Sequence, residues 1–331
     1  MRVPSRSSGQ RPGPAAPSPG TSTTSPAVAG PSRSGPSRGG PALPDDGPDL
    51  AAYRAAVAEL LVEIGALADP GSATARQALV DDRLRDPVVV AVLDATPAGL
   101  VAARETLLLE LARYQPSGRS AVRDLTGLVR CYLLSRIDLM WWRDVPAFAT
   151  DAQVRDSPDL VDLEWLRRRD LARFRYREEP TSRVGRALRA ADRRLRPYAA
   201  PDTAGVRSRR TRREVVALLN DVAREFASAA PAGTPPLWVT SLVRSAEEQY
   251  RRRRLGHPVP LPGAHCLGWT VDVELDWYRR FGAREVLAGI LRDRQEAGEV
   301  NVVDAGSVWH VCPAPSTRAR LRRAYEVELG T

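Results

Sequence analysis

Apolar positions recur at helical spacing through the middle of the chain. Asp49 suits a helix N-cap, and behind it an i, i+3, i+4 stripe is formed by Tyr53, Val57, Leu60, Leu61 and Ile64. Thr96 and Pro97 suit an N-cap and a first-turn proline for a helix over Leu100–Tyr114. Further helical stretches are predicted from Ser117 to Trp141, over about 159–178 and over about 181–196.

The pattern changes after a break rich in Pro, Gly and Ala at 229–236. Residues 269–275 alternate between polar and apolar side chains, which is typical of a strand with one buried face. Two apolar runs, 300–303 and 308–311, flank Ala-Gly and predict a hairpin. The other predicted elements are a strand at 237–240, a helix opened by the capping box Ser245–Glu248, a helix over about 283–297 and a basic helix from about 316.

The composition of the first residues differs from that of the rest. Residues 1–44 contain 10 proline, 9 serine and 7 glycine residues. Such a segment buries too little apolar surface to offset the entropy cost of ordering, so we expect it to be disordered. We therefore predict an α+β protein in three parts: a disordered tail over 1–48, an all-helical module over 49–205, and a small α+β domain with an antiparallel sheet over 206–331.

The formal net charge is +9, and all 49 basic residues are arginine. Arginine together with much alanine and leucine indicates a GC-rich coding bias, so the basic balance alone is weak evidence for a nucleic-acid partner. Residues 165–214 hold 17 arginines against 6 acids. This stretch fits either solvated helix faces or a surface for nucleic acid or an anionic cell-wall polymer. The solvated faces are favoured, because no interleaved exposed aromatics or known docking motif accompany the arginines.

The sequence disfavours several classes of protein. No apolar run approaches the roughly 20 residues that a membrane span needs, and no apolar signal core follows Arg2. Three cysteines, Cys131, Cys266 and Cys312, are too few for a disulfide framework. We therefore expect a cytoplasmic protein and leave its oligomeric state open.

The three histidines, His257, His265 and His310, all lie in the last third of the chain. His265 and Asp272 converge if the histidine sits in a turn that leads into the strand bearing the aspartate, and Gly268 lets the backbone bend between them. His310, on a neighbouring hairpin strand, completes the set. Two imidazoles and one carboxylate with an open position suit a catalytic zinc ion.

Three short segments carry a family resemblance. Residues 263–272, GAHCLGWTVD, keep the histidine, glycine and aspartate of S-x-H-x-x-G-x-A-x-D, with glycine and threonine in place of its serine and alanine. Residues 241–249, SLVRSAEEQ, are similar to S-G-Y-R-S-x-x-x-Q, and Trp309-His310 matches a final Trp-His. This part of the chain, about 235–315, resembles the zinc D-alanyl-D-alanine carboxypeptidases and dipeptidases, which share a fold with the hedgehog signalling domain.

The resemblance implies a role for each matched residue. The zinc ligands would be His265, Asp272 and His310. Arg244 would neutralise a substrate carboxylate or a developing oxyanion, because its planar guanidinium group can donate two parallel hydrogen bonds to such a group. Ser241 and Gln249 would belong to the same substrate-binding set. Zinc would lower the pKa of its water to about 7 and so supply a nucleophile at neutral pH.

The general base departs from the family pattern. The carboxypeptidases have a glutamate three residues before the final histidine, where this chain has Ser307. In hedgehog-type domains the glutamate lies six residues before that histidine, where this chain has Asp304. Asp304 is therefore the predicted base, with one methylene less reach than glutamate. Glu274, two residues beyond Asp272 on the same strand face, is the second choice, as a base or as an orienting residue.

The favoured function is a zinc-dependent hydrolase of a small peptide or peptidoglycan fragment with a free carboxylate. One alternative is a catalytically inactive homologue whose zinc site stabilises the fold or binds a ligand. A second alternative is nucleic-acid binding through the arginine-rich helices. Cys266 and Cys312, each within two residues of a predicted ligand, are read as small buried hydrophobes, with soft metal ligands or a redox pair as the alternatives.

Overall fold

The computed structural model describes residues 47–67, 72–114, 122–196, 198–255 and 263–329. Residues 46–331 group into one compact unit. Of the predicted disordered tail, only residues 47 and 48 are described. Ser117 and His257 also lie outside the described residues.

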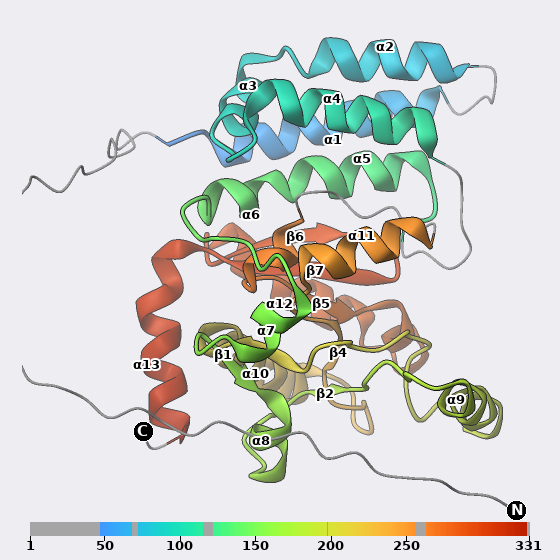
Figure 1. Cartoon of the computed structure of the whole chain (residues 1–331), viewed down its shortest axis with the longest axis vertical. Coiled ribbons are helices and arrows are strands. Elements are labelled where there is room, and N and C mark those ends of the chain that lie inside the picture. The colour runs from blue at the N-terminus through green and yellow to red at the C-terminus, as the bar shows by residue number, and fades with distance from the viewer. Residues whose placement is uncertain (1–46, 68–71, 115–121, 197, 256–262, 330–331) are drawn as a thin grey trace, which may run out of the picture. The chain divides into compact units, whose positions relative to one another are not determined.

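The described chain begins with six helices that share a core (Figure 1). They are α1 (Leu50–Ala66), α2 (Ala73–Arg83), α3 (Pro87–Asp94), α4 (Gly99–Arg113), α5 (Leu125–Leu134) and α6 (Arg136–Trp141). The predicted N-cap is confirmed, since the side chain of Asp49 accepts from the backbone N–H groups of Ala51 and Ala52 at 2.9 Å. Tyr53 is fully buried, and its hydroxyl donates to the carbonyl oxygen of Leu133 at 2.9 Å.

The helix predicted over 100–114 is present as α4, but the roles predicted for Thr96 as its N-cap and Pro97 as its first-turn proline are wrong. Asp86 caps α3 and Pro87 takes its first turn. The Thr96 hydroxyl then donates back to the carbonyl oxygen of Leu93 at 2.7 Å, so it closes the end of α3 and does not open α4. The chain turns at Gly99, the first residue of α4, whose φ is +72°.

The helix predicted over 159–178 is only partly present. This part of the chain forms β1 (Leu160–Asp162), α8 (Leu163–Arg168) and β2 (Arg175–Tyr176). Each strand is stabilised by a partner distant in sequence: Leu160 pairs with Arg212 of β3, and Arg175 with Trp238 of β4. The neighbouring elements are α7 (Asp151–Asp156), α9 (Arg183–Leu195), β3 (Arg210–Arg212) and α10 (Arg213–Ala229).

The strands of the last third join β2 in one sheet. They are β4 (Trp238–Ser241), β5 (Val271–Glu274), β6 (Val300–Asp304) and β7 (Val308–Pro313), and the described sheet has the order β2-β4-β5-β7-β6. The hairpin of β6 and β7 is antiparallel, as predicted. The sheet as a whole is mixed, because β2 runs parallel to β4. Helices α11 (Ala246–Arg254), α12 (Arg284–Glu296) and α13 (Arg318–Leu329) complete this α+β part.

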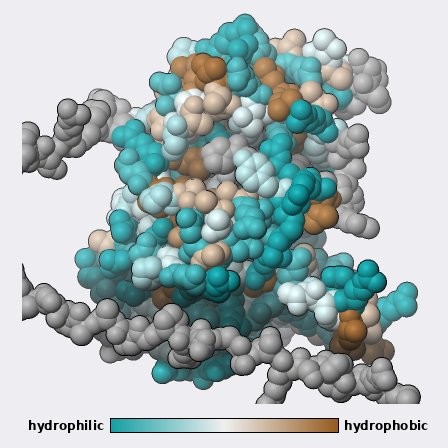
Figure 2. All heavy atoms as spheres, viewed as in Figure 1, coloured by the Kyte–Doolittle hydropathy of each residue, from teal (hydrophilic) through white to brown (hydrophobic). Residues whose placement is uncertain are grey.

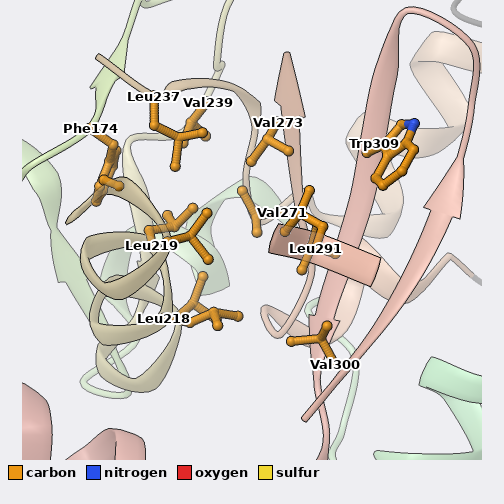
Figure 3. Packing of buried hydrophobic residues seen from close by; sticks show 14 of the residues in the cluster. Phe174, Leu218, Leu219, Leu237, Val239, Val271, Val273, Leu291, Val300 and Trp309 are labelled. Atoms are coloured by element: carbon orange, nitrogen blue, oxygen red, sulfur yellow. The ribbon is translucent and has the colours of Figure 1, made fainter. Parts of the chain in front are cut away.

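The two faces of the sheet have different neighbours. One face packs its apolar side chains against α10 and α12, in the core where Leu219, Val271 and Leu291 meet (Figure 3). The other face is turned toward the six-helix part, and α5 lies against β6 (Figure 1). The polar side chains of β5 and β7 therefore lie between the sheet and the helices.

An indole pair joins the helices to the turn before β5. The rings of Trp142, at the end of α6, and Trp269 are stacked with centroids 3.6 Å apart and an interplanar angle of 7°. Trp142 Nε1 also donates to the carbonyl oxygen of Pro313 at 3.1 Å. Both side chains are buried, so this contact fixes the end of α6 against β5 and β7.

Over the described residues, no single helix is both long and apolar enough to span a membrane. The bent pair of α3 and α4 meets the length and composition test together, with a bend of 103°. Both helices bury apolar side chains in the six-helix core, among them Val92 and Leu107.

Replacement of Trp142 tests the contribution of the indole pair to stability. We expect Trp142→Ala to lower the free energy of unfolding by about 3–5 kcal/mol, because it removes a buried indole and the stacking contact of that indole with Trp269. The control is Trp165→Ala on α8, where the side chain is 44% exposed and the expected loss is about 1 kcal/mol or less. Denaturant unfolding measures both, and equal losses would contradict the role given to Trp142.

Candidate metal centre

The sheet register brings two predicted ligands side by side. Asp272 on β5 pairs directly with His310 on β7, so both side chains leave the same face of the sheet. His265 lies in a 3-10 turn just before β5. Gly268 ends that turn with φ +75°, and a Cβ there would lie 3.3 Å from the Phe148 ring. The predicted bend between His265 and Asp272 is therefore present.

The side chains of His265, Asp272 and His310 converge. Oδ1 of Asp272 lies 3.1 Å from His265 Nε2 and 3.2 Å from His310 Nδ1. The two imidazole rings are nearly perpendicular, with centroids 5.1 Å apart. One ligand atom from each residue lies within 4.8 Å of the other two, a spacing at which a single metal ion can be held.

Each histidine is oriented by a hydrogen bond on its outer nitrogen. His265 Nδ1 lies 2.9 Å from the carbonyl oxygen of Leu242, which only accepts, so this nitrogen donates and Nε2 keeps its lone pair toward Asp272. His310 Nε2 donates to Oδ2 of Asp138 at 2.6 Å, which leaves Nδ1 facing Asp272. Such outer partners are typical of metal-binding histidines, since they fix the tautomer and the ring orientation.

Asp138 comes from α6 and was missed by the sequence analysis. Its carboxylate is fully buried and also accepts from Nδ2 of Asn301 at 2.8 Å. Asn301 in turn donates to the carbonyl oxygen of Leu134 at 3.0 Å and accepts from Arg54 at 3.2 Å. The sequence does contain a sign of this role. Asp138 lies between Ile137 and Leu139 in an apolar helical stretch, where a buried carboxylate needs a hydrogen-bonding partner.

The environment gives the two histidines opposite protonation. Burial lowers the pKa of His265 to about 4, although Asp272 partly offsets it, so His265 is neutral. Burial also opposes the charge of His310, but the carboxylates of Asp138 and Asp272 outweigh it and raise its pKa to about 9. Burial alone would raise the pKa of Asp272, yet its contacts with His265, His310 and Arg244 hold that pKa well below the usual range.

A cleft of about 500 Å³ opens beside the triad. Asp272 lines it together with Ser241, Arg244, Glu274 and Ser307. Arg244 donates to the Ser241 hydroxyl and to Oδ2 of Asp272, the latter at 3.2 Å. Burial raises the pKa of Glu274 to about 7. Besides the predicted ligand Asp272, the cleft is lined by three further carboxylates and by four arginines, which are Asp202, Glu274, Asp276, Arg123, Arg244, Arg252 and Arg280.

Asp304 lies apart from this cleft. It pairs with Trp309, the neighbour of His310, so its side chain leaves the opposite face of the sheet from the triad. Its Oδ1 accepts from the backbone N–H of Gly306 at 2.7 Å, within the hairpin turn. The structure therefore does not bring the predicted base to the metal-binding face, whereas Ser307 does line the cleft.

Gln249 and the cysteines also lie outside the triad. Gln249 is fully buried, and its Nε2 contacts the sulfur of Cys266 at 3.5 Å, so it is not among the residues that line the cleft. Cys266 and Cys312 are free and buried, and burial raises the pKa of both thiols. A protonated thiol is a poor metal ligand, which favours the reading of both as small buried hydrophobes.

Comparison with protein-family models, with curated proteins and with solved structures finds no match for this chain. What the structure shows is a buried His265, Asp272 and His310 group able to hold a metal ion, within a mixed α+β region.

Substitution of Asp138 tests its influence on the triad. We expect Asp138→Asn to weaken zinc binding about 10- to 100-fold, because the volume is kept while the charged acceptor for His310 is lost. Competition with a chromophoric chelator measures the affinity. The control is Glu214→Gln, a buried acid on α10 whose partners are Arg318 and Arg322. Unchanged affinity in Asp138→Asn, or an equal loss in the control, would contradict the assignment.

Metal binding should also displace the proton of His310. At about pH 7.5 His310 is protonated and His265 is neutral, so binding of one zinc ion releases about one proton from the triad. The share that His310 releases falls toward zero above about pH 9, where His310 is already neutral, so the total release, which includes the proton of the zinc-bound water, is smaller at pH 10 than at pH 7.5. Calorimetry in buffers of different ionisation enthalpy measures this number. A release that stays constant from pH 7.5 to 10 would contradict the protonation given to His310.

Proposed function

We propose that this chain is a zinc-dependent hydrolase of the D-Ala-D-Ala carboxypeptidase and dipeptidase type, acting on a small peptide or peptidoglycan-derived fragment. The observation that carries the proposal is the convergence of His265, Asp272 and His310, of which Asp272 lines a cleft together with Arg244. These are the residues in which the sequence resembles that family. The convergence supports the resemblance independently of sequence similarity.

The donor set fits zinc. Two imidazole nitrogens and one carboxylate oxygen leave one tetrahedral position open, and each imidazole is already oriented by an outer acceptor. Bound zinc supplies a Lewis acid and brings the pKa of water to about 7. The thiols of Cys266 and Cys312 stay outside the set, which favours zinc in a nitrogen and oxygen environment over a thiolate site.

The chain's own residues bind the substrate and move its protons. Arg244 faces the cleft with its guanidinium held by Ser241 and Asp272, so it is placed to bind a substrate carboxylate or to neutralise an oxyanion. Glu274 is the carboxylate best placed to act as general base, because it lines the cleft on the same sheet face as Asp272. We therefore prefer Glu274 to Asp304 for that role.

One observation favours a catalytically inactive zinc protein as the second candidate. Ser307 occupies the position of the carboxypeptidase glutamate and lines the cleft, but a serine does not accept a proton at neutral pH. The nucleic-acid alternative has less support, because eight of the 17 arginines in the 165–214 stretch form ion pairs with acids, such as Arg167 with Glu164 and Arg209 with Asp162.

Hydrolysis assays on variants separate these candidates. Zinc-loaded protein is expected to hydrolyse D-Ala-D-Ala or a peptide ending in it, and Glu274→Gln to lower kcat about 10²- to 10⁴-fold. Asp304→Asn is the matched control, a carboxylate on the opposite sheet face, and should change kcat less than about threefold.

Ser307→Glu addresses the inactive alternative. It places a carboxylate in the cleft at the family position, so we expect it to rescue part of the activity of Glu274→Gln. If the wild type and Ser307→Glu are both inactive while binding a full equivalent of zinc, the peptidase proposal is wrong and the non-catalytic zinc protein is favoured.

A further inference from the structure

Helix α9 carries an apolar stripe that packs against nothing in the described chain. At 100° per residue, Val184, Leu188 and Leu195 point within about 40° of one another. Their exposed fractions are 69%, 66% and 81%, and no residue of α9 is buried. Figure 2 shows this apolar surface at the lower right, beside hydrophilic side chains. A helix on a globular protein usually turns such a stripe to the core.

The helix is attached to the body by a different face. Arg189 donates to the backbone carbonyl oxygens of Glu178 and Ala204, and Asp192 forms an ion pair with Arg177 at 3.1 Å. The polar side of α9 therefore makes its tertiary contacts, and its apolar stripe is left facing solvent. This reversal indicates that the stripe has a partner outside the described residues.

The charges beside the stripe indicate what that partner is. Arg183 and Arg194 lie about 100° round the helix from Val184, on the side away from the attachment, and Arg186 lies opposite the stripe. Within the described residues no carboxylate pairs with any of these three. On α8, by contrast, Arg167 and Arg168 both pair with Glu164.

We propose that α9 is an interfacial helix that binds an anionic lipid bilayer, with its apolar stripe in the acyl boundary and Arg183 and Arg194 among the lipid headgroups. A short helix with one apolar face and arginines beside it has the pattern that lies in such an interface. A nucleic acid uses the arginines but leaves the stripe exposed. A second copy covers the stripe but brings the unpaired arginines of both helices together.

The helix is connected to the candidate cleft through the chain, because residues 202–205, which follow α9 closely, line that cleft. Tyr198, just after the helix, is 65% exposed and suits the headgroup region. The proposal does not depend on the metal or on hydrolysis, because no residue of α9 takes part in either.

The test is flotation of the full-length protein with vesicles in the presence of a chelator. Vesicles of phosphatidylcholine with phosphatidylglycerol are compared with phosphatidylcholine alone. We expect binding to the anionic vesicles only, and a loss of at least about tenfold in Leu188→Asp/Leu195→Asp. The matched control is Val62→Asp/Val327→Asp, which alters two valines that are 74% and 82% exposed and makes the same change in net charge. It should bind as the wild type does.

Three outcomes would overturn the proposal. One is the absence of binding to anionic vesicles, and another is equal binding by the stripe variant and its control, which would assign the affinity to other arginines. The third is a dimer in sedimentation that the stripe variant abolishes, which would make a second copy the occupant. Zinc content measured on the same samples keeps a failure of this proposal separate from a failure of the metal centre.

Discussion

The structure depends on one imidazole held between two carboxylates from different parts of the chain. His310 of β7 contacts Asp272 of β5 through one ring nitrogen and Asp138 of α6 through the other. Asp138 is fully buried, so its charge is tolerated only while His310 and Asn301 donate to it. The helices and the sheet therefore form the site jointly. A boundary at 205–206 would separate Asp138 from the histidine it orients, which gives the predicted helical module a structural role in the metal centre.

The same contacts explain the electrostatics of the site. Arg244 pairs with Asp272, and the proton on His310 supplies a second positive charge that lies between Asp272 and the buried carboxylate of Asp138. A metal cation held by His265, Asp272 and His310 would replace that proton as the source of positive charge. His265 has no proton to lose on metal binding, since burial already keeps its imidazole neutral. The three side chains are thus already close enough, and oriented, to hold a cation.

The sequence predicted the parts of the site that are local and missed those that need tertiary contacts. His265, Gly268 and Asp272 lie within eight residues, so a turn into a strand was enough to bring them together. Asp138 is 172 residues from His310, and only docking of α6 reveals their contact. Asp304 shows the limit of spacing arguments on a hairpin, because one residue of register decides the face on which a side chain emerges. Strands β1 and β2 were read as helix because only distant partners pair with them.

The central claim is that two imidazoles and one carboxylate, with no sulfur, surround a shared ion. X-ray absorption spectroscopy of the zinc-loaded protein measures this directly. We expect one zinc per chain with two imidazole nitrogens at about 2.0–2.1 Å and the remaining scatterers oxygen, and loss of that signal in His310→Ala. A sulfur scatterer at about 2.3 Å, which would place Cys266 or Cys312 on the metal, or less than half an equivalent of bound zinc, would contradict it.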